Sequence, residues 1–186
     1  MVKPEILDLR ILLDKDIQIS DILKHPDEPK LYISSYDGFL YCFGLQEDLK
    51  LVLEFESRPF IGAIRRMALL PAKKSKVIFW KRSVFLIIVE LAVGAADGRI
   101  CFVDIATGKP KLRLDKLFPG SGASITALAG LDETDTLVAI GNESGDVKII
   151  DLKNLEKPVV ASFDNLNDAV SDLVHFPHKK TLVCSG

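Results

Sequence analysis

The sequence predicts an all-β fold built from repeated four-stranded units. Two observations lead to this prediction. A block of residues near the start of the chain recurs near its end, and a glycine turn between short alternating strands recurs along the chain. The first copy of the block comprises 19–23, His25-Pro26 and 31–35, and the second comprises 170–174, Phe176-Pro177 and 182–186. The internal spacing is the same in both copies, which is typical of a repeat architecture.

The glycine turns divide the chain into units. They consist of the pairs Asp37-Gly38, Asp97-Gly98 and Ser144-Gly145. Each pair predicts a two-residue hairpin turn, because glycine supplies the positive φ that such turns require. An alternating strand follows each turn (39–43, 99–103, 146–150), and a further strand follows that one (49–55, 111–117, 159–163). No segment of 12 residues sustains a period of 3.6, so we expect essentially no helix.

Four short strands per unit indicate the blades of a β-propeller. We therefore predict a partial propeller of about three and a half four-stranded blades. It forms one incomplete domain over 1–186, with units at about 15–57, 58–118, 119–164 and 165–186, the last of them truncated.

One unit is longer than the others. Gly38 and Gly98 are 60 residues apart, whereas Gly98 and Gly145 are 47 apart. The surplus corresponds to 77–90, which we predict to be an insert. It has two interpretations. The first is a longer loop with an extended strand. The second is a retained intron, because introns begin with GT and end with AG, the segment begins with valine, whose codons begin with GT, and it ends with glutamate, one of whose codons ends in AG. Spliced cDNA distinguishes them.

Composition excludes several classes of protein. Hydrophobic residues make up 48% of the 186 residues and charged residues 27%, which is too apolar for intrinsic disorder. The net charge of −2 argues against a chain that coats nucleic acid. The start of the chain has no secretory signal pattern, and the longest apolar run, 84–93, has about half the ~20 residues of a membrane helix. We expect a protein of the cytoplasm or nucleus without a membrane partner.

No residue pattern indicates catalysis. The thiols of Cys42, Cys101 and Cys184 are widely spaced and predict buried side chains rather than disulfides or metal ligands. His25 and His175 are expected in equivalent loops of the repeat, without sulfur or acidic ligands at metal spacing. A phosphate-binding glycine motif is also absent. We expect no enzyme activity, no cofactor and no small-molecule substrate.

Charge along the chain is more informative. The stretch 57–89 contains no acidic residue, and within it Lys73, Lys74 and Lys76 form a short basic cluster. This cluster has three interpretations: a nuclear-import signal, a patch that contacts RNA phosphates, or the solvated rim of a loop.

The units resemble WD repeats, although degenerate ones. The Trp-Asp pair that closes such a repeat corresponds here to Val103-Asp104 and Ile150-Asp151, and the opening Gly-His pair is absent. The chain further resembles the WD repeat-containing protein 55 family over 19–45, 123–128, 137–145, 169–174 and 179–186. This resemblance implies a propeller of about seven blades, of which this chain would supply only part. It also implies a strand at 7–11 that closes the ring.

The same resemblance implies a function. Family members are nucleolar scaffolds of ribosome biogenesis, so we expect protein partners such as a pre-ribosomal particle, and a role in rRNA processing for the large subunit. An alternative is a substrate receptor of a cullin-type ubiquitin ligase. Some WD propellers dock on a ligase adaptor through Trp-Asp-x-Arg, which corresponds here to Ile150, Asp151, Leu152 and Lys153. Lysine cannot reproduce the bidentate fork of arginine, which weakens this alternative.

Overall fold

The computed structural model describes residues 16–46, 50–70, 76–80, 83–87, 91–115, 117–118, 122–131, 136–164 and 166–186. Side chains within 76–90 lie outside this description, as do Lys73, Lys74 and the strand expected at 7–11. The described elements are β1 (Ile19–Lys24), β2 (Lys30–Ser35), β3 (Leu40–Leu45), β4 (Leu51–Ser57), β5 (Ile64–Leu69), β6 (Lys76–Trp80), β7 (Ser83–Ile87), β8 (Leu91–Ala95), β9 (Ile100–Val103), β10 (Pro110–Leu114), β11 (Ile125–Gly130), β12 (Leu137–Asn142), β13 (Val147–Asp151), β14 (Val159–Phe163), β15 (Asp172–Phe176), the 3-10 turn Pro177–Lys179 and β16 (Thr181–Ser185).

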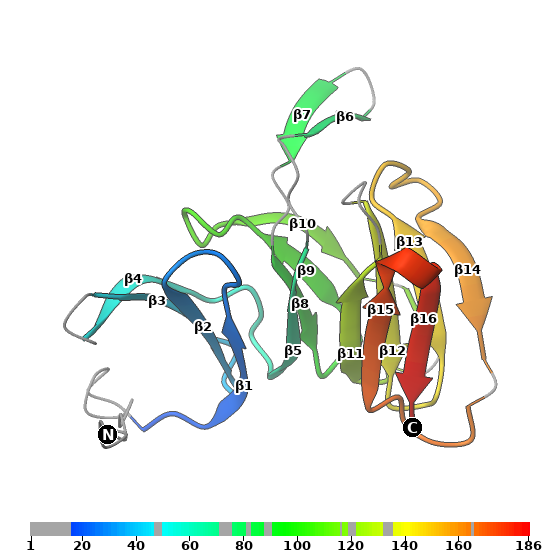
Figure 1. The fold of residues 1–186 in the computed structure, drawn as a ribbon, viewed down its shortest axis with the longest axis horizontal. Coiled ribbons are helices and arrows are strands. Elements are labelled where there is room, and N and C mark those ends of the chain that lie inside the picture. Colours follow the sequence, from blue (N-terminus) through cyan, green and yellow to red (C-terminus); the bar gives the residue numbers. More distant parts are fainter. Residues whose placement is uncertain are drawn as a thin grey trace.

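The strands form three four-stranded antiparallel sheets and a two-stranded one that follows them (Figure 1). Their orders are β1-β2-β3-β4, β10-β9-β8-β5, β11-β12-β13-β14 and β15-β16. In each complete sheet every strand pairs with its neighbour in the chain, apart from β5, which pairs with β8 across the β6–β7 segment. The predicted fold class, an all-β partial propeller, is confirmed.

The first strand of each sheet lies beside the first strand of the next. The strands β1, β5, β11 and β15 therefore form a continuous inner row, one from each sheet. Two side chains link these strands. The carboxylate of Asp21 accepts a hydrogen bond from the Met67 amide at 2.8 Å. Arg66 donates to the carbonyl of Thr126 at 2.9 Å and to that of Ser171 at 3.0 Å. Arg66 therefore connects three successive sheets.

Apolar side chains fill the space between consecutive sheets. The first and second sheets share a cluster that includes Leu40, Cys42, Met67, Val93 and Cys101. The second and third share one that includes Ile100, Phe102, Leu128, Ile140 and Ile150. A smaller cluster, with Ala139, Val147, Val170 and Leu173, joins the third sheet to β15. Because alternate residues of one strand contact opposite neighbours, the central strands are apolar on both faces, as in stacked blades.

The hairpin loops differ from the predicted two-residue turns. In the first, the Ser35 amide donates to the Phe39 carbonyl at 3.0 Å and the Gly38 amide donates to the Ser35 carbonyl at 3.2 Å. Three residues therefore lie in the loop, and Gly38 is the last of them, with φ of 89°. Gly98 and Gly145 repeat this geometry, with φ of 78° and 87°. This is a turn followed by a left-handed glycine, the usual three-residue hairpin.

The backbone of 76–87 forms a separate hairpin. β6 and β7 pair with each other and with no other described strand, with Lys76 opposite Ile87. The hairpin follows β5 and precedes β8 in the chain, and Figure 1 shows it projecting away from the sheets. A hairpin is compatible with both interpretations of the insert, so both stay predictions.

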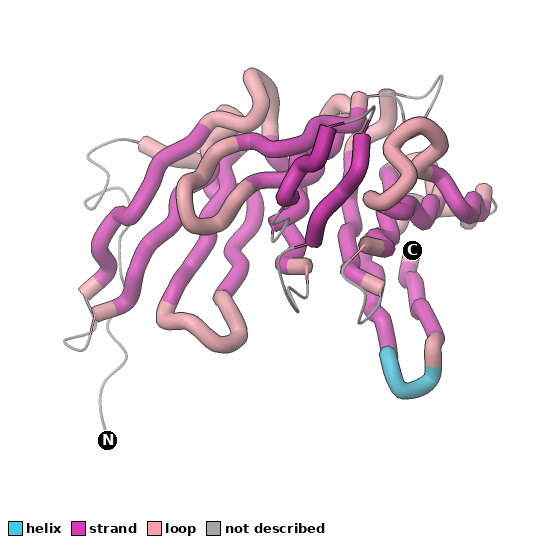
Figure 2. The backbone as a smooth tube through the Cα atoms, turned by 90° about the horizontal axis from the view of Figure 1, so that it is seen from above, coloured by secondary structure: helices cyan, strands magenta, loops and turns pink. Residues whose placement is uncertain are grey.

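Figure 2 shows the sheets from above, with the β15–β16 hairpin at the C-terminal end of the chain.

Candidate functional site

The three turn glycines have a structural role. A Cβ atom added to Gly38, Gly98 or Gly145 would lie 2.7 Å, 2.9 Å or 2.8 Å from the carbonyl oxygens of Gly62, Ala123 and Asp168, respectively. Each of these carbonyls belongs to the link that leads to the next sheet. Each turn therefore packs against the link to the following sheet, and only glycine fits there.

The aspartate that ends a third strand also has a structural role. The carboxylate of Asp151 accepts the Lys153 amide at 2.9 Å, and that of Asp104 accepts the Ala106 amide at 2.9 Å. Such hydrogen bonds from the backbone to an aspartate side chain fix the start of the loop between the third and fourth strands. Lys153 itself is exposed.

The basic cluster predicted at Lys73, Lys74 and Lys76 stays a prediction. Lys76 begins β6, and Lys73 and Lys74 lie outside the described residues.

Two other arginines of the acid-free stretch do lie together on the surface. Arg58 is 4.9 Å from the ring centre of Phe39, and it donates to the carbonyls of Asp37 at 3.2 Å and Ile61 at 3.4 Å. Arg65 is 5.3 Å from the ring centre of Tyr36 and reaches its hydroxyl at 3.5 Å. Both arginines are exposed, and neither has a carboxylate partner among the described residues.

Ile61, whose carbonyl accepts the hydrogen bond from Arg58, is 85% exposed, which is the highest value for a large apolar side chain in the described part of the molecule. The residues Tyr36, Arg58, Ile61 and Arg65 are named the Ile61 surface below. Aromatic residues and arginines around an apolar side chain are the composition of protein-binding hot spots.

The loop that carries Ile61 is fixed from beneath. The preceding residue, Phe60, is 2% exposed and packs in the cluster between the first two sheets. Arg113 lies 5.6 Å from the ring centre of Phe60 and donates a hydrogen bond to the carbonyl of Pro59. Ile61 is therefore presented on an anchored loop, which lowers the entropy cost of binding through it.

A hollow of about 620 Å³ borders the Ile61 surface at Tyr36. Asp16, Ile17, Gln18 and Asp37 line the rest of it. The hollow contains two carboxylates, from Asp16 and Asp37, whereas the side chain that contacts Tyr36 is the basic Arg65. A partner that covers both regions would need an acidic and a basic group a short distance apart.

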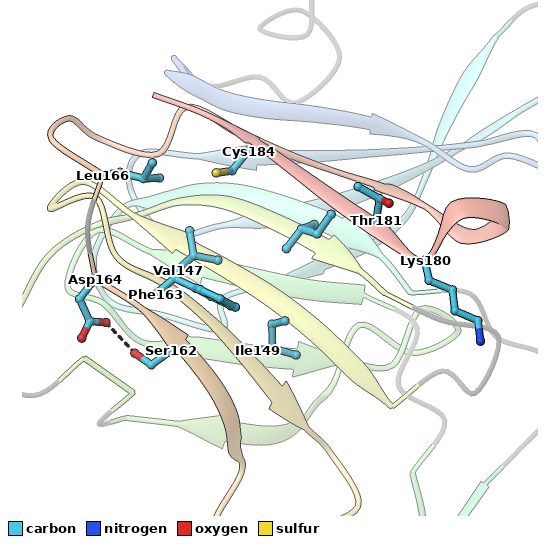
Figure 3. Close-up of a pocket in the computed structure, with 10 residues that line it drawn as sticks. Val147, Ile149, Ser162, Phe163, Asp164, Leu166, Lys180, Thr181 and Cys184 are labelled. Carbon is cyan, nitrogen blue, oxygen red and sulfur yellow. Dashed lines mark hydrogen bonds between the residues drawn. The ribbon is translucent and has the colours of Figure 1, made fainter.

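A second feature is a groove of about 730 Å³ between β13–β14 and β16 (Figure 3). Its apolar lining comes from Val147, Ile149, Phe163, Leu166, Leu182 and Cys184. Polar residues border it: Ser162 donates to Asp164 at 2.7 Å, and Lys180 and Thr181 lie at the start of β16. No sequence pattern pointed to this groove, because its two walls come from different sheets.

The thiols and histidines occupy varied environments. Burial raises the pKa of Cys42 to about 12 and that of Cys101 to about 11, and both thiols are buried as predicted. Cys184 is exposed, so the prediction of a buried thiol was wrong for it. His25 accepts the Glu28 amide at 2.9 Å in a loop. His175 lies inside β15, because the two copies of the block align Lys24, not His25, with it; the expected loop equivalence was wrong.

In the described part of the chain, no three His, Cys, Asp or Glu side chains are placed to bind a metal ion. A search of the same residues finds no helix that is long and apolar enough to cross a membrane.

Consecutive four-stranded sheets whose first strands lie side by side define a β-propeller fold, and solved structures support this fold. Sqt1 from Chaetomium thermophilum is 20% identical with a TM-score of 0.61, over 84% of this chain and 38% of that one. A chain of the mitotic checkpoint complex is 16% identical with a TM-score of 0.66, over 90% of this chain and 44% of that one. This chain thus spans less than half the length of either structure. No family model and no curated protein matches it.

Proposed function

We propose that this chain is a non-enzymatic scaffold that binds other proteins through the Ile61 surface. The observation that carries the proposal is an 85% exposed isoleucine on an anchored loop, beside two arginines that have no carboxylate partner within the described part of the chain. Exposing such a side chain is unfavourable unless a partner covers it, and the arginines favour an acidic partner. The partner we propose is a protein segment with an apolar side chain next to a carboxylate.

The process we propose is ribosome biogenesis, in which the chain would contact a pre-ribosomal particle in the nucleolus during rRNA processing for the large subunit. The support is the resemblance of 19–45 and of the later repeat segments to the WD repeat-containing protein 55 family. RNA contact by the basic cluster at Lys73, Lys74 and Lys76 would be secondary to protein contact.

A pull-down with the tagged full chain tests both parts. We expect co-purification of pre-ribosomal proteins, and a loss of about tenfold or more in captured protein for Ile61→Asp and Arg65→Glu. Val52→Asp and Lys157→Glu are matched controls, because both residues are exposed on outer parts of other strands and loops. Equal capture by Ile61→Asp and the wild type would remove this surface from the proposal.

The ligase-receptor alternative is tested in the same experiment. It requires a ligase adaptor that is captured by the wild type and lost with Asp151→Ala. Because Asp151 also supports its own loop, Asp104→Ala is the matched control for loop damage. Loss of an adaptor with Asp151→Ala but not with Asp104→Ala would favour the alternative.

A further inference from the structure

The link between the first two sheets, residues 58–63, crosses the end of the sheets at which the glycine turns lie. It leads from β4, the outermost strand of the first sheet, to β5, the innermost strand of the second, and it carries Ile61. Neighbouring strands are about 4.8 Å apart, so this path is about 14 Å long. Both joined sheets are complete, and the second sheet has a described sheet on either side. The surface along the link is therefore formed between complete sheets.

Three arginines of the second sheet lie along this link. Arg99 and Arg113 are 5.7 Å and 5.6 Å from the ring centre of Phe60, which belongs to the link. They project from the same face of the sheet, because Arg113 is opposite Cys101 and Arg99 precedes Cys101 by two residues. Arg65 lies at the inner end of the link, near the start of β5. Positive charge therefore follows the link from its middle to its inner end.

The fold does not require these three arginines. When the second and third sheets are aligned by their turn glycines and strand pairings, the corresponding residues of the third sheet are Thr126, Asp146 and Ser162. None of these three is basic. The next link is instead contacted by Lys148, which is 4.9 Å from the ring centre of Phe118 and donates to the Leu117 carbonyl at 2.6 Å. One cation thus supports that link among the described residues, whereas the first link has three arginines from the sheet that follows it.

Carboxylates of the described chain leave most of this positive charge available. The Asp97 carboxylate accepts a hydrogen bond from Nε of Arg99 at 2.7 Å, and Asp115 is exposed near Arg99. Arg65 and Arg113 form no ion pair with a described carboxylate. Both guanidinium groups are already held against aromatic rings. An incoming carboxylate would therefore gain charged hydrogen bonds while little side-chain freedom is lost.

We propose that an extended acidic segment of another protein lies along this link, with carboxylates toward the three arginines and an apolar side chain on Ile61. Alternate residues of an extended segment point the same way about 7 Å apart, so carboxylates four residues apart span about 14 Å, the length of the link. This inference rests on the proposed function and deepens it, because it adds Arg99 and Arg113 to the binding surface and gives the partner a length and a charge pattern.

The probe is a fluorescent synthetic peptide that has three glutamates at alternate positions and one leucine. It is titrated with the full chain and followed by fluorescence anisotropy. The matched peptide has glutamine in place of each glutamate. We expect saturable binding of the acidic peptide that weakens as salt is raised, and binding of the glutamine peptide that is weaker by about tenfold or more. Equal binding of the two peptides would overturn the proposal.

Two double variants test the location. Arg99→Asp with Arg113→Ser introduces the residue types that the third sheet has at these positions, and it should weaken binding of the acidic peptide about tenfold. Lys109→Asp with Lys153→Ser makes the same change of charge at exposed residues of the opposite end of the sheets. This control should bind within about twofold of the wild type. An equal loss in both double variants would show that the peptide responds only to net charge, which would overturn the proposal.

Asp97→Asn gives a result that damage to the fold does not mimic. This substitution removes the carboxylate that competes for Arg99, so the acidic peptide should bind about twofold more tightly than it binds the wild type. Unchanged or weaker binding by Asp97→Asn would overturn the role proposed for Arg99.

Two further outcomes separate this inference from its neighbours. If Ile61→Asp loses captured protein in the pull-down while the double variant of Arg99 and Arg113 captures as much as the wild type, the inference fails and the proposed function stands. If oligouridine binds the same arginines and displaces the acidic peptide at a concentration below that of the peptide, the surface belongs to RNA and the inference fails as well.

Discussion

At the scale of single residues, the turn glycines combine two requirements. Gly145 has a positive φ of 87° and faces the Asp168 carbonyl, so Gly145→Ala introduces both backbone strain and a steric clash. We expect a loss of about 2 kcal/mol or more in unfolding free energy, measured by denaturant titration. Gly122→Ala is the control for strain alone, because Gly122 has φ of 54° but open space around it. Its cost should be about 1 kcal/mol. Equal costs at the two positions would contradict the packing role.

The thiols allow a second residue-scale prediction. Burial raises the pKa of Cys42 to about 12 and of Cys101 to about 11, so neither forms the reactive thiolate near neutral pH. We expect a chromogenic disulfide reagent to modify one thiol rapidly in the native chain and all three after denaturation. Cys184→Ser should abolish the rapid phase. Rapid labelling that persists in Cys184→Ser would contradict the buried positions of the other two.

At the scale of elements, Arg66 of β5 holds the inner strands together. Its guanidinium donates to the Thr126 carbonyl of β11 and to the Ser171 carbonyl just before β15, so Arg66→Ala removes contacts that join three successive sheets. We expect a destabilisation of about 1–2 kcal/mol in thermal or denaturant unfolding. The neighbouring Arg65→Ala should cost less than about 0.5 kcal/mol, because Arg65 is exposed and its side chain contacts Tyr36 on the surface. A larger effect at Arg65 than at Arg66 would argue against the link.

At the scale of the whole molecule, stability should fall in acid. A hydrogen bond from Arg99 holds the pKa of Asp97 below its usual range, and a hydrogen bond from Lys30 does the same for Glu28. A carboxyl group with a lowered folded pKa contributes stability above its unfolded pKa, about 3.9 for aspartate, and this contribution is lost as pH falls through the folded value.

We therefore expect the melting temperature to decrease between about pH 6 and pH 3. Asp97→Asn should melt below the wild type at pH 6 and closer to it at pH 3, by a small amount because the pair is partly exposed. Parallel pH profiles for the two proteins would exclude a contribution from Asp97.

Much of the fold could be predicted because it depends on local patterns. Alternation over five residues, as in 146–150, predicts a strand, and the Gly in Asp37-Gly38 predicts a hairpin before any long-range contact is known. The loop length could not be predicted, because two-residue and three-residue hairpins share the same Asp-Gly pattern. The position of His175 was also missed, by one residue, since the two histidines were taken as equivalent, whereas the shift of 151 residues that aligns Pro26 with Pro177 aligns Lys24 with His175.

The candidate site depended more on tertiary structure. The acid-free stretch 57–89 includes both Arg65 and Arg66, but its composition does not distinguish exposed Arg65 from Arg66, which faces the inner strands. Ile61 and Phe60 are adjacent and both apolar, yet one is exposed and the other buried. Which of them is buried is decided by the sheet that packs against the loop, and the sequence carries no local signal of that packing.

The sequence by itself determined the repeat, the strands and the places where glycine must turn the chain, because each follows from the backbone preferences of a few neighbouring residues. Only the tertiary structure decided which side chains meet between sheets. It separated Arg58 and Arg65 from Arg66, exposed Ile61 on an anchored loop, and placed Cys184 in the groove beside β16. These outcomes depend on contacts between residues far apart in the chain, which alternation and turn spacing do not encode.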